Sequence, residues 1–212
     1  MGAPDQSTNS APRRPGRPRG SVASNTEATR ERILEVAIGL FATVGYHATS
    51  VAEIGTRTDL QPGALYYHIK SKEELLWEIL RRYTEKALAG AQRVTAMDVD
   101  PVEKLGQLID VHVGIIARHR REVLIQVRDA DALSAEHMAQ LQELRQQIQD
   151  CWEGVLEEGY RAGRFTRANR IVANGLLGMV NSVSQWYRPR RGATADEIAR
   201  EFRAMVIEGL AR

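Results

Sequence analysis

The sequence predicts an all-α protein with a small helical unit near its N-terminus and a larger helical bundle after it. Three observations support this. Alternating apolar and polar runs rich in β-branched residues, which mark strands, are scarce in the 212 residues. Apolar residues instead recur at helical spacing, and capping signals for helix starts recur along the chain. Hydrophobic residues make up 43% of the chain, which is enough for a substantial core.

Residues 1–24 form an arm rich in Pro, Ser, Gly, Asn and Arg, with almost nothing to bury. We expect this arm to be disordered in isolation. Its first 20 residues hold four arginines against a single acid, Asp5. The basic excess of the chain therefore lies on the arm, as in proteins that touch nucleic acid with a tail.

The first helix is predicted over about Thr26–Val44. Its start fits a capping box, in which the side chains of Ser24 and Glu27 satisfy free backbone donors. Gly45 follows as a left-handed residue that ends the helix. One apolar stripe at helical spacing supplies the inward face, namely Ile33, Leu34, Ala37, Leu40 and Phe41.

Two short helices follow, at about Val51–Arg57 and Pro62–Ile69, and the first of them has a capping box at Ser50. The chain must turn between them in about four residues. Asp59 tolerates a left-handed backbone better than most residues do, and Pro62 presets the first turn of the next helix. These lengths and this turn together predict a helix-turn-helix.

The remainder of the chain predicts a bundle of amphipathic helices. The fourth helix, about Lys72–Arg93, has a capping box at Ser71 and Glu74. Further helices are expected at about Val102–Arg118, Arg121–Asp129, Ala135–Ala162, Ala168–Tyr187 and Ala195–Leu210.

A specific family resemblance emerges over about residues 26–76. The chain reads Ile33-Leu34-x-x-Ala37-x-x-x-Phe41-x-x-x-Gly45-Tyr46-x-x-Thr49-Ser50-Val51-x-x-Ile54, and later Gly63-Ala64-Leu65-Tyr66-Tyr67-His68-Ile69-x-x-Lys72-Glu73-x-Leu75. This pattern resembles the TetR family of bacterial transcriptional regulators. The chain departs from the family at Asp59, where glycine is common, and at Ile69, where phenylalanine is common.

The resemblance implies an N-terminal three-helix helix-turn-helix DNA-binding domain, at residues 25–72. It implies a C-terminal helical-bundle effector and dimerisation domain, at residues 73–212. The expected protein is a homodimeric, ligand-responsive repressor that binds a palindromic double-stranded DNA operator and leaves it when a small hydrophobic effector binds.

Ten residues are candidates for DNA binding. The resemblance assigns DNA contacts to Tyr66, Tyr67 and His68, and phosphate contacts to Ser50 and Lys72. The residues that open the third helix carry no long hydrogen-bonding side chain, so base readout is expected to rest on Gln61, Tyr66 and the arm. The alternative for the two tyrosines is an ordinary place in the core. The full set is Arg17, Arg19, Ser50, Gln61, Gly63, Ala64, Tyr66, Tyr67, His68 and Lys72.

The arm segment Arg13–Gly20 is similar to the Gly-Arg-Pro core of AT-hook peptides. Narrow A·T minor grooves concentrate negative potential and attract arginine, so Arg17 and Arg19 are expected to enter one beside the site read by the third helix. The alternative is a solvated tail that adds only non-specific attraction.

A ligand pocket is expected between the fourth helix and those after it, with a strongly apolar wall. The segments Leu177–Asn181 and Trp186–Pro189 are similar to a motif in TetR regulators of fatty-acid, aromatic or steroid breakdown, many of which sense acyl-CoA thioesters. That likeness makes an acyl-CoA the leading effector, although each lining residue would serve equally as plain core and each arginine as a partner of a helix dipole. The candidates are Trp77, Tyr83, Ile109, His112, Ile116, Met138, Leu141, Leu144, Ile148, Trp152, Asn181 and Arg188.

The last two helices carry apolar stripes that the family uses to pair two copies about a two-fold axis. Their alternative is internal packing alone. The stripes comprise Ile171, Val172, Gly175, Leu176, Met179, Val180 and Val183 on one helix, and Ile198, Phe202, Met205 and Val206 on the other.

Other classes of protein find little support. The chain has one cysteine, Cys151, and no phosphate-binding glycine loop or hydrolase motif, so no enzyme, cofactor or metal site is expected. Neither a secretory signal nor an apolar run of membrane-spanning length is present, and a cytoplasmic location is expected. Two alternatives remain open: a drug-sensing repressor of an efflux pump, and a non-specific architectural DNA-binding protein.

Overall fold

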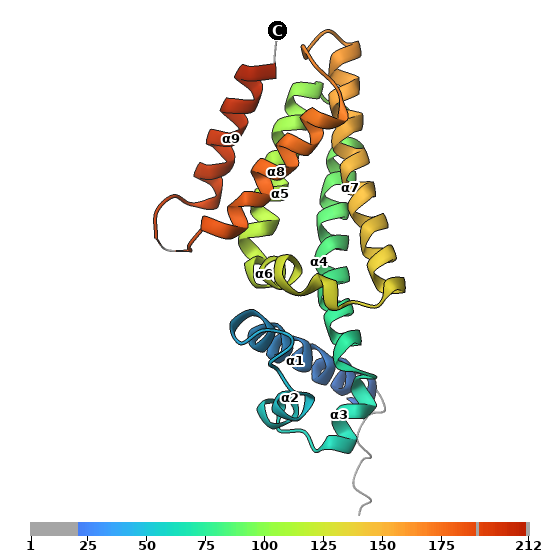
Figure 1. Ribbon diagram of the computed structural model, residues 1–212. Helices are drawn as coiled ribbons and strands as arrows, with labels where there is room; N and C mark the ends of the chain where they lie inside the picture. Colours follow the sequence, from blue (N-terminus) through green and yellow to red (C-terminus); the bar gives the residue numbers. More distant parts are fainter. Residues whose placement is uncertain (1–20, 190, 211–212) are drawn as a thin grey trace, which may run out of the picture.

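The computed structural model describes residues 21–189 and 191–210, and these fold into α-helices without a β-strand among them (Figure 1). In order, the elements are α1 (Ser21–Thr43), α2 (Val51–Thr58), α3 (Pro62–His68), α4 (Lys72–Thr95), α5 (Pro101–Arg118), α6 (Arg120–Asp129), the short 3₁₀ helix η1 (Ala130–Ala132), α7 (Ala135–Arg161), α8 (Arg170–Trp186) and α9 (Ala195–Leu210).

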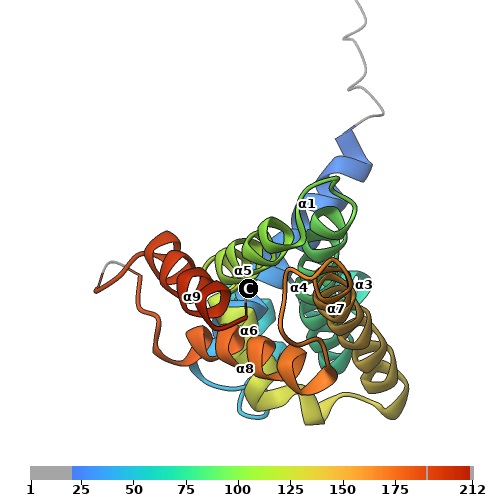
Figure 2. The same cartoon turned by 90° about the horizontal axis from the view of Figure 1, so that it is seen from above.

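The helices form two parts that share one long element. Helices α1, α2 and α3 make a compact unit at one end, and α4 runs from this unit up into the bundle (Figure 1). Within the bundle, α5 packs against α4, α7, α8 and α9. Seen from above, α9 lies on one side of α5, α4 and α7 lie on the other, and α8 runs across from the side of α9 to that of α7 (Figure 2). Because α4 belongs to both parts, a displacement of its bundle end moves the end beside α3.

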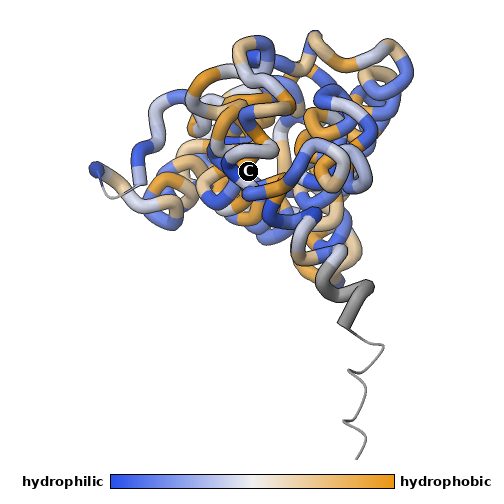
Figure 3. The backbone as a smooth tube through the Cα atoms, turned by 90° about the horizontal axis from the view of Figure 1, so that it is seen from below, coloured by the Kyte–Doolittle hydropathy of each residue, from blue (hydrophilic) through white to orange (hydrophobic). Residues whose placement is uncertain are grey.

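Two hydrophobic cores match the two parts. The lower core joins Leu40 of α1, Ile54 of α2 and Leu65 of α3 to the first turns of α4. The upper core surrounds Leu105 and Trp152 in the bundle. Each fully buried large aliphatic side chain contributes about 1.5–3 kcal/mol to stability. From the end that carries α1–α3, hydrophobic and hydrophilic residues alternate along the helices, as amphipathic packing requires (Figure 3).

The predicted helix ends are confirmed from α2 onward, where expected and observed bounds differ by two residues or fewer. The hydroxyl of Ser50 accepts the backbone N–H of Glu53, and that of Ser71 accepts the N–H of Glu74. Asp59 is left-handed, with φ 53° and ψ 40°, and Gly45 has φ 105°. These local signals act through backbone groups only a few residues away, which is why the sequence reveals them.

One expected boundary was wrong, and one element was missed. Helix α1 begins at Ser21, so residues 21–24 of the expected disordered arm are helical and Ser24 lies inside the helix. The rest of the arm, residues 1–20, lies outside the described residues, and the expectation of disorder there stays a prediction. The 3₁₀ helix η1 was not expected, because three residues carry no periodicity.

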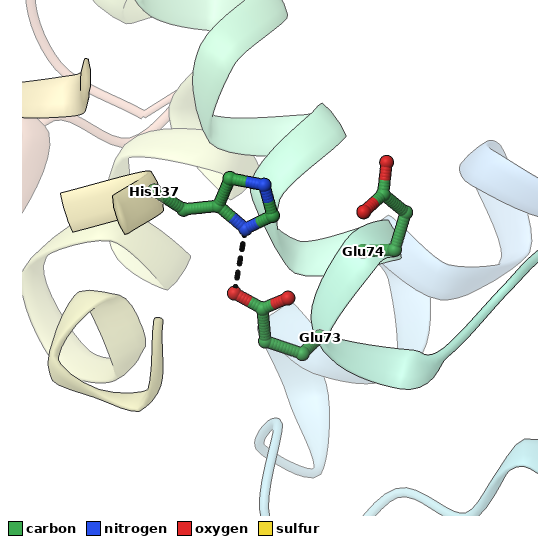
Figure 4. A group of neighbouring side chains, drawn as sticks. All are labelled: Glu73, Glu74 and His137. Carbon is green, nitrogen blue, oxygen red and sulfur yellow. Dashed lines mark hydrogen bonds and ion pairs between the residues drawn. The ribbon is translucent and has the colours of Figure 1, made fainter. Parts of the chain in front are cut away.

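Two of the polar clusters that hold the bundle on the N-terminal unit lie at the start of α4 and at the end of α6. At the start of α4, a Glu73 carboxylate oxygen accepts the backbone N–H of Ser134 at 2.9 Å and lies 2.8 Å from Nδ1 of His137 (Figure 4). Trp77 stacks on the His137 ring with a centroid separation of 4.7 Å. The carboxylate of Glu74 faces the same ring, so the first turn of α4 and the first turn of α7 meet through this cluster.

The second joint lies at the end of α6. The buried carboxylate of Asp129 accepts the backbone N–H of Tyr46 at 3.4 Å and three hydrogen bonds from Arg128. The guanidinium of Arg128 also donates to the backbone carbonyl of Phe41, near the end of α1. Helix α6 is thereby tied to the loop that precedes α2.

Candidate nucleic-acid interface and ligand cavity

Helices α2 and α3 are held in a helix-turn-helix by close packing at the turn. The N–H of Leu60 donates to the carbonyl of Gly55 at 3.0 Å. A Cβ atom on Gly55 would lie 3.2 Å from Cδ2 of Leu65, so a larger residue there would require the Leu65 side chain to shift by a few tenths of an ångström. Leu65 is buried and anchors α3 while the rest of its surface faces outward.

The outward face of α3 carries two aromatic side chains. Tyr66 is 58% exposed and Tyr67 is 80% exposed, so neither lies in the core, and the alternative of buried tyrosines is wrong. Gln61, Gly63 and Ala64 are exposed beside them. Hydroxyls and an amide on a narrow rod of seven residues match the shape and chemistry that a major groove accepts.

A hollow of about 470 Å³ lies between α2 and α3 on this surface. Tyr66, Gln61 and Thr56 contribute to its wall, and the N-terminus of α2 with exposed Ser50 lies at its side. Free backbone amides at a helix N-terminus attract phosphate, so Ser50 lies where the DNA backbone would pass.

The ammonium of Lys72 makes contacts within the protein, and its expected phosphate contact stays a prediction. This ammonium donates to the backbone carbonyls of Tyr46 and Thr49 at 2.9 Å each, and it lies 4.3 Å from the centroid of the Tyr46 ring. Lys72 thus ties α4 to the loop before α2. A DNA phosphate that contacted Lys72 would have to share the ammonium with these two carbonyls. His68 is half-buried at the end of α3 with its ring edge against Tyr67.

A cavity of about 380 Å³ lies between α4, α5, α6, α7 and α8, and it is open to solvent along α8, where Asn174, Gly178 and Asn181 are exposed. Its wall is more polar than the sequence suggested. Helices α4–α6 contribute Tyr83, Thr84, Ala87, His112 and Gln126, and helices α7 and α8 contribute Arg145, Ile148, Gln149, Asn174, Leu177, Gly178 and Asn181.

Burial sets the protonation of two groups in this wall. Burial lowers the pKa of His112 to about 4, against a smaller opposing effect of its hydrogen bond to Asn181, so the ring is neutral at pH 7. The ring nitrogen Nε2 lies 3.2 Å from Oδ1 of Asn181, which joins α5 to α8 across the cavity. Burial also raises the pKa of Tyr83, so its hydroxyl stays protonated.

Comparison with known families agrees with both parts of this geometry. Residues 33–79 match a family model described as bacterial regulatory proteins, tetR family, and residues 98–210 match one described as tetracyclin repressor-like, C-terminal domain. This chain belongs to the TetR family.

Individual TetR-family members resemble the chain over most of its length. The HTH-type transcriptional repressor KstR2 of Rhodococcus jostii RHA1 is 29% identical over 198 residues, which span 92% of this chain and 97% of that protein. The solved ketosteroid transcriptional regulator KstR2 of Mycobacterium tuberculosis has a TM-score of 0.80 at 27% identity, over 86% of this chain and 95% of that one. AibR, solved with isovaleryl coenzyme A and operator DNA, has a TM-score of 0.75 at 27% identity, over 84% and 97%.

Four of the twelve predicted effector-site residues line the cavity of this TetR-family protein, namely Tyr83, His112, Ile148 and Asn181. The placement of the others is corrected. Ile109, Ile116 and Trp152 are buried in the upper core, with Leu144 at its edge, and Trp77, Leu141 and Met138 belong to the lower core. Arg188 is exposed beyond the end of α8 and donates to the carbonyls of Gln185 and Tyr187.

The correction has a physical cause. Helices α4 and α7 each pass both cores, so their first turns face α1 and α6 while only their middle turns reach the cavity. The sequence reading missed the polar wall residues Gln126, Arg145, Gln149 and Asn174. A usable signal exists on α8, where Asn174, Gly178 and Asn181 share one face at helical spacing.

The apolar residues of α8 and α9 fall into two groups, one buried in the bundle and one exposed on its surface. Val180, Val183, Ile198 and Val206 are buried against the bundle, as the alternative of internal packing held. Other apolar residues of the two helices stay exposed, among them Ile171 at 82%, Met205 at 62% and Trp186 at 48%. Across the described ranges, no helix is both long and apolar enough to serve as a membrane span.

Proposed function

We propose that this TetR-family protein is a homodimeric repressor that binds a palindromic DNA operator and leaves it when a small effector enters the bundle cavity. One observation carries the proposal. Helix α4 contributes Tyr83, Thr84 and Ala87 to the cavity, and only three residues separate the start of this helix from the end of the recognition helix α3. Helix α4 therefore connects the cavity to α3, so an effector that moves α4 also moves the recognition helix.

The DNA-binding domain in this proposal spans residues 25–72, with the bundle at 73–212. Tyr66, Tyr67 and Gln61 read the major groove, and Ser50 contacts a phosphate. Exposure of these side chains on a short helix supports the assignment. Arg17 and Arg19 lie outside the described residues, and their entry into the minor groove is part of the proposal.

Dimerisation is proposed through α8 and α9. TetR-family regulators bind operator DNA as dimers. The exposed apolar side chains Ile171, Met205 and Trp186 support an interface on these two helices, because burial of apolar surface against a second copy removes it from water. A two-fold axis there would present two copies of α3 to successive major grooves.

The proposed transmission uses α6 together with α4. Gln126 of α6 lines the cavity and accepts a hydrogen bond from Thr84 of α4 at 3.3 Å. One turn later, Asp129 holds the N–H of Tyr46 in the loop before α2. An effector that displaces Gln126 would shift both α4 and this loop. The effector can shift the equilibrium between the DNA-binding and the released conformation only by the difference between its binding free energies for those two conformations.

An acyl-CoA thioester is the effector class we propose. AibR was solved with isovaleryl coenzyme A, and KstR2 is described as a ketosteroid regulator, which supports an acyl or steroid-derived compound. The cavity of about 380 Å³ matches the lower part of the range for drug-sized ligands, so it would hold the acyl part while the coenzyme extends outward past α8. A sensor of cationic drugs would need an acid in the wall, and the described lining residues offer Arg145 instead.

Operator release is the direct test. Duplexes selected from a random pool provide the operator, and fluorescence anisotropy measures its binding with and without acyl-CoA thioesters of fatty, aromatic and steroid acids. Gly178→Leu fills the cavity from a position where an added Cβ meets nothing within 4 Å. We expect this variant to bind the operator and to lose release, whereas Gly154→Leu, an equally open helical position, keeps both. Release that persists in Gly178→Leu would contradict the proposed site.

The architectural alternative makes a different prediction. A non-specific DNA-binding protein would be displaced from the selected duplex as readily by random-sequence DNA as by the duplex itself. A specific regulator resists such competitor by a factor of about 10³ or more. Equal displacement by random-sequence DNA and by the selected duplex would contradict the repressor proposal.

A further inference from the structure

The wall of the bundle cavity carries one formal charge among the described residues, and it is positive. Arg145 of α7 is part of the lining, and no aspartate or glutamate is. His112 adds no charge at pH 7, because burial lowers its pKa to about 4. The cavity is therefore an electropositive chamber with otherwise neutral polar groups.

Arg145 lacks the acidic partners that the half-buried Arg203 has. Arg203 on α9, for comparison, pairs with Glu103 at 2.8 Å and with Asp110 at 2.9 Å. Arg145 takes part in no ion pair or hydrogen bond within the described part of the chain, and its one electrostatic neighbour is the neutral hydroxyl of Tyr83. Desolvation lowers the pKa of Arg145, which records the cost of holding this charge away from water. A guanidinium stays charged under such conditions, so it lacks a counter-charge.

The surroundings of Arg145 favour an amphiphilic occupant. Ile148, Leu177 and Ala87 give the cavity an apolar side. The Tyr83 hydroxyl, kept protonated by burial, is a further donor on the polar side. A planar guanidinium with a nearby hydroxyl matches two oxygens of one anionic group, while an apolar body fills the rest.

We propose that the effector is an apolar compound with an anionic oxygen group, and that Arg145 binds this group. The inference rests on the proposed function and adds the charge of the ligand and the residue that recognises it. A free carboxylate and a phosphate of a coenzyme A thioester share this chemistry. Because Arg145 is a partly desolvated cation without a counter-charge among the described residues, a neutral analogue leaves that cost unrelieved and a cationic one increases it.

The test compares matched probes on the full chain. Decanoate, phenylacetate and a steroid carboxylate are each titrated beside their primary amides and their coenzyme A thioesters, and calorimetry gives each Kd. For at least one family of probes, we expect the acid or its thioester to bind at least tenfold more tightly than the amide. Tighter binding by the acid identifies the carboxylate as the recognised group, and tighter binding by the thioester identifies a phosphate.

Variants then assign the effect to the arginine. In Arg145→Gln, the acid or thioester should bind less than threefold more tightly than the amide, and Arg145→Lys should retain part of the native difference in Kd. Arg93→Gln removes an exposed arginine of α4 outside the cavity wall and should change nothing. Without ligand, the thermal midpoint of Arg145→Gln should equal or exceed that of the native chain, because an unpaired desolvated charge is lost.

Four results would overturn the inference: an amide that binds as tightly as its acid and thioester, an advantage that survives in Arg145→Gln, a falling midpoint in that variant, or no binding by any anionic probe. The proposed function is judged separately. A neutral compound that releases the operator from the native chain, but not from Gly178→Leu, would uphold the effector site and refute only the anion assignment.

Discussion

Replacement of Asp129 by alanine tests the joint between the bundle and the DNA-binding domain. The Asp129 side chain is 3% exposed, and its carboxylate is the acceptor for the Tyr46 N–H at 3.4 Å. A buried donor left without its acceptor costs about 1–3 kcal/mol. The pair with Arg128 adds at most about 1 kcal/mol, because Arg128 is nearly half exposed and solvent screens it. The expected loss of unfolding free energy is therefore about 1–4 kcal/mol.

That loss has two readouts. For a chain of this size, 1 kcal/mol corresponds to a shift of about 2–4 °C, so the thermal midpoint should fall by roughly 2–16 °C at fixed protein concentration. The amide of Tyr46 should also exchange its hydrogen at least tenfold faster, because the loop before α2 is no longer fastened to α6.

Two companion variants separate the acceptor from the charge. Asp129→Asn keeps an oxygen for the Tyr46 N–H and should lose about half as much stability. Asp131→Ala changes an exposed acid in η1 and should stay within about 0.5 kcal/mol of the native chain. An equal midpoint for Asp129→Ala and Asp131→Ala would refute the assignment of this joint.

Further variants test the remaining parts. Tyr67→Ala, at a position 80% exposed, should leave stability within about 0.5 kcal/mol and weaken operator binding at least tenfold in an anisotropy titration. Lys72→Met should lower the thermal midpoint by the loss of two charge-assisted hydrogen bonds, about 1.5–3 kcal/mol in all, and a drop of about 0.9 in the salt slope of binding would show a phosphate contact as well. Deletion of residues 1–20 should reduce that slope by up to about 0.9 for each of its four arginines, and an unchanged slope and affinity would exclude the arm from DNA. Burial lowers the folded pKa of His112 to about 4, so the unfolded chain binds a proton there that the folded chain does not; stability should fall by up to about 2 kcal/mol from pH 6.5 to pH 5, and His112→Gln should lose this component in urea titrations.

The sequence could predict those features that depend on near neighbours. Caps at Ser50 and Ser71 and the left-handed turn at Asp59 act within three or four residues, and each lies where the pattern placed it. The exposure of Tyr66 and Tyr67 follows similarly, since a helix of seven residues anchored by Leu65 has little room to bury more.

Features that depend on distant contacts could not be predicted. Trp77 and Ile148 both lie on apolar stripes, yet one faces the lower core and the other the cavity, according to which part of a long helix each occupies. Lys72 bonds to carbonyls 23 and 26 residues earlier, which no local pattern encodes. Arg145 looks like an ordinary surface arginine in the sequence, and only the packing of α7 against α4 and α8 turns it into the cavity wall.

The central feature of the proposed function is the presentation of two copies of α3 to one DNA duplex. Selection of bound sequences from random duplexes, carried out with the native chain and with Tyr67→Ala, measures this directly. We expect the native chain to enrich an inverted repeat whose half-site centres lie about 34–36 Å apart, or a multiple of that distance, and the variant to lose this enrichment. A single asymmetric site, no enriched sequence, or the same repeat from both proteins would contradict the account.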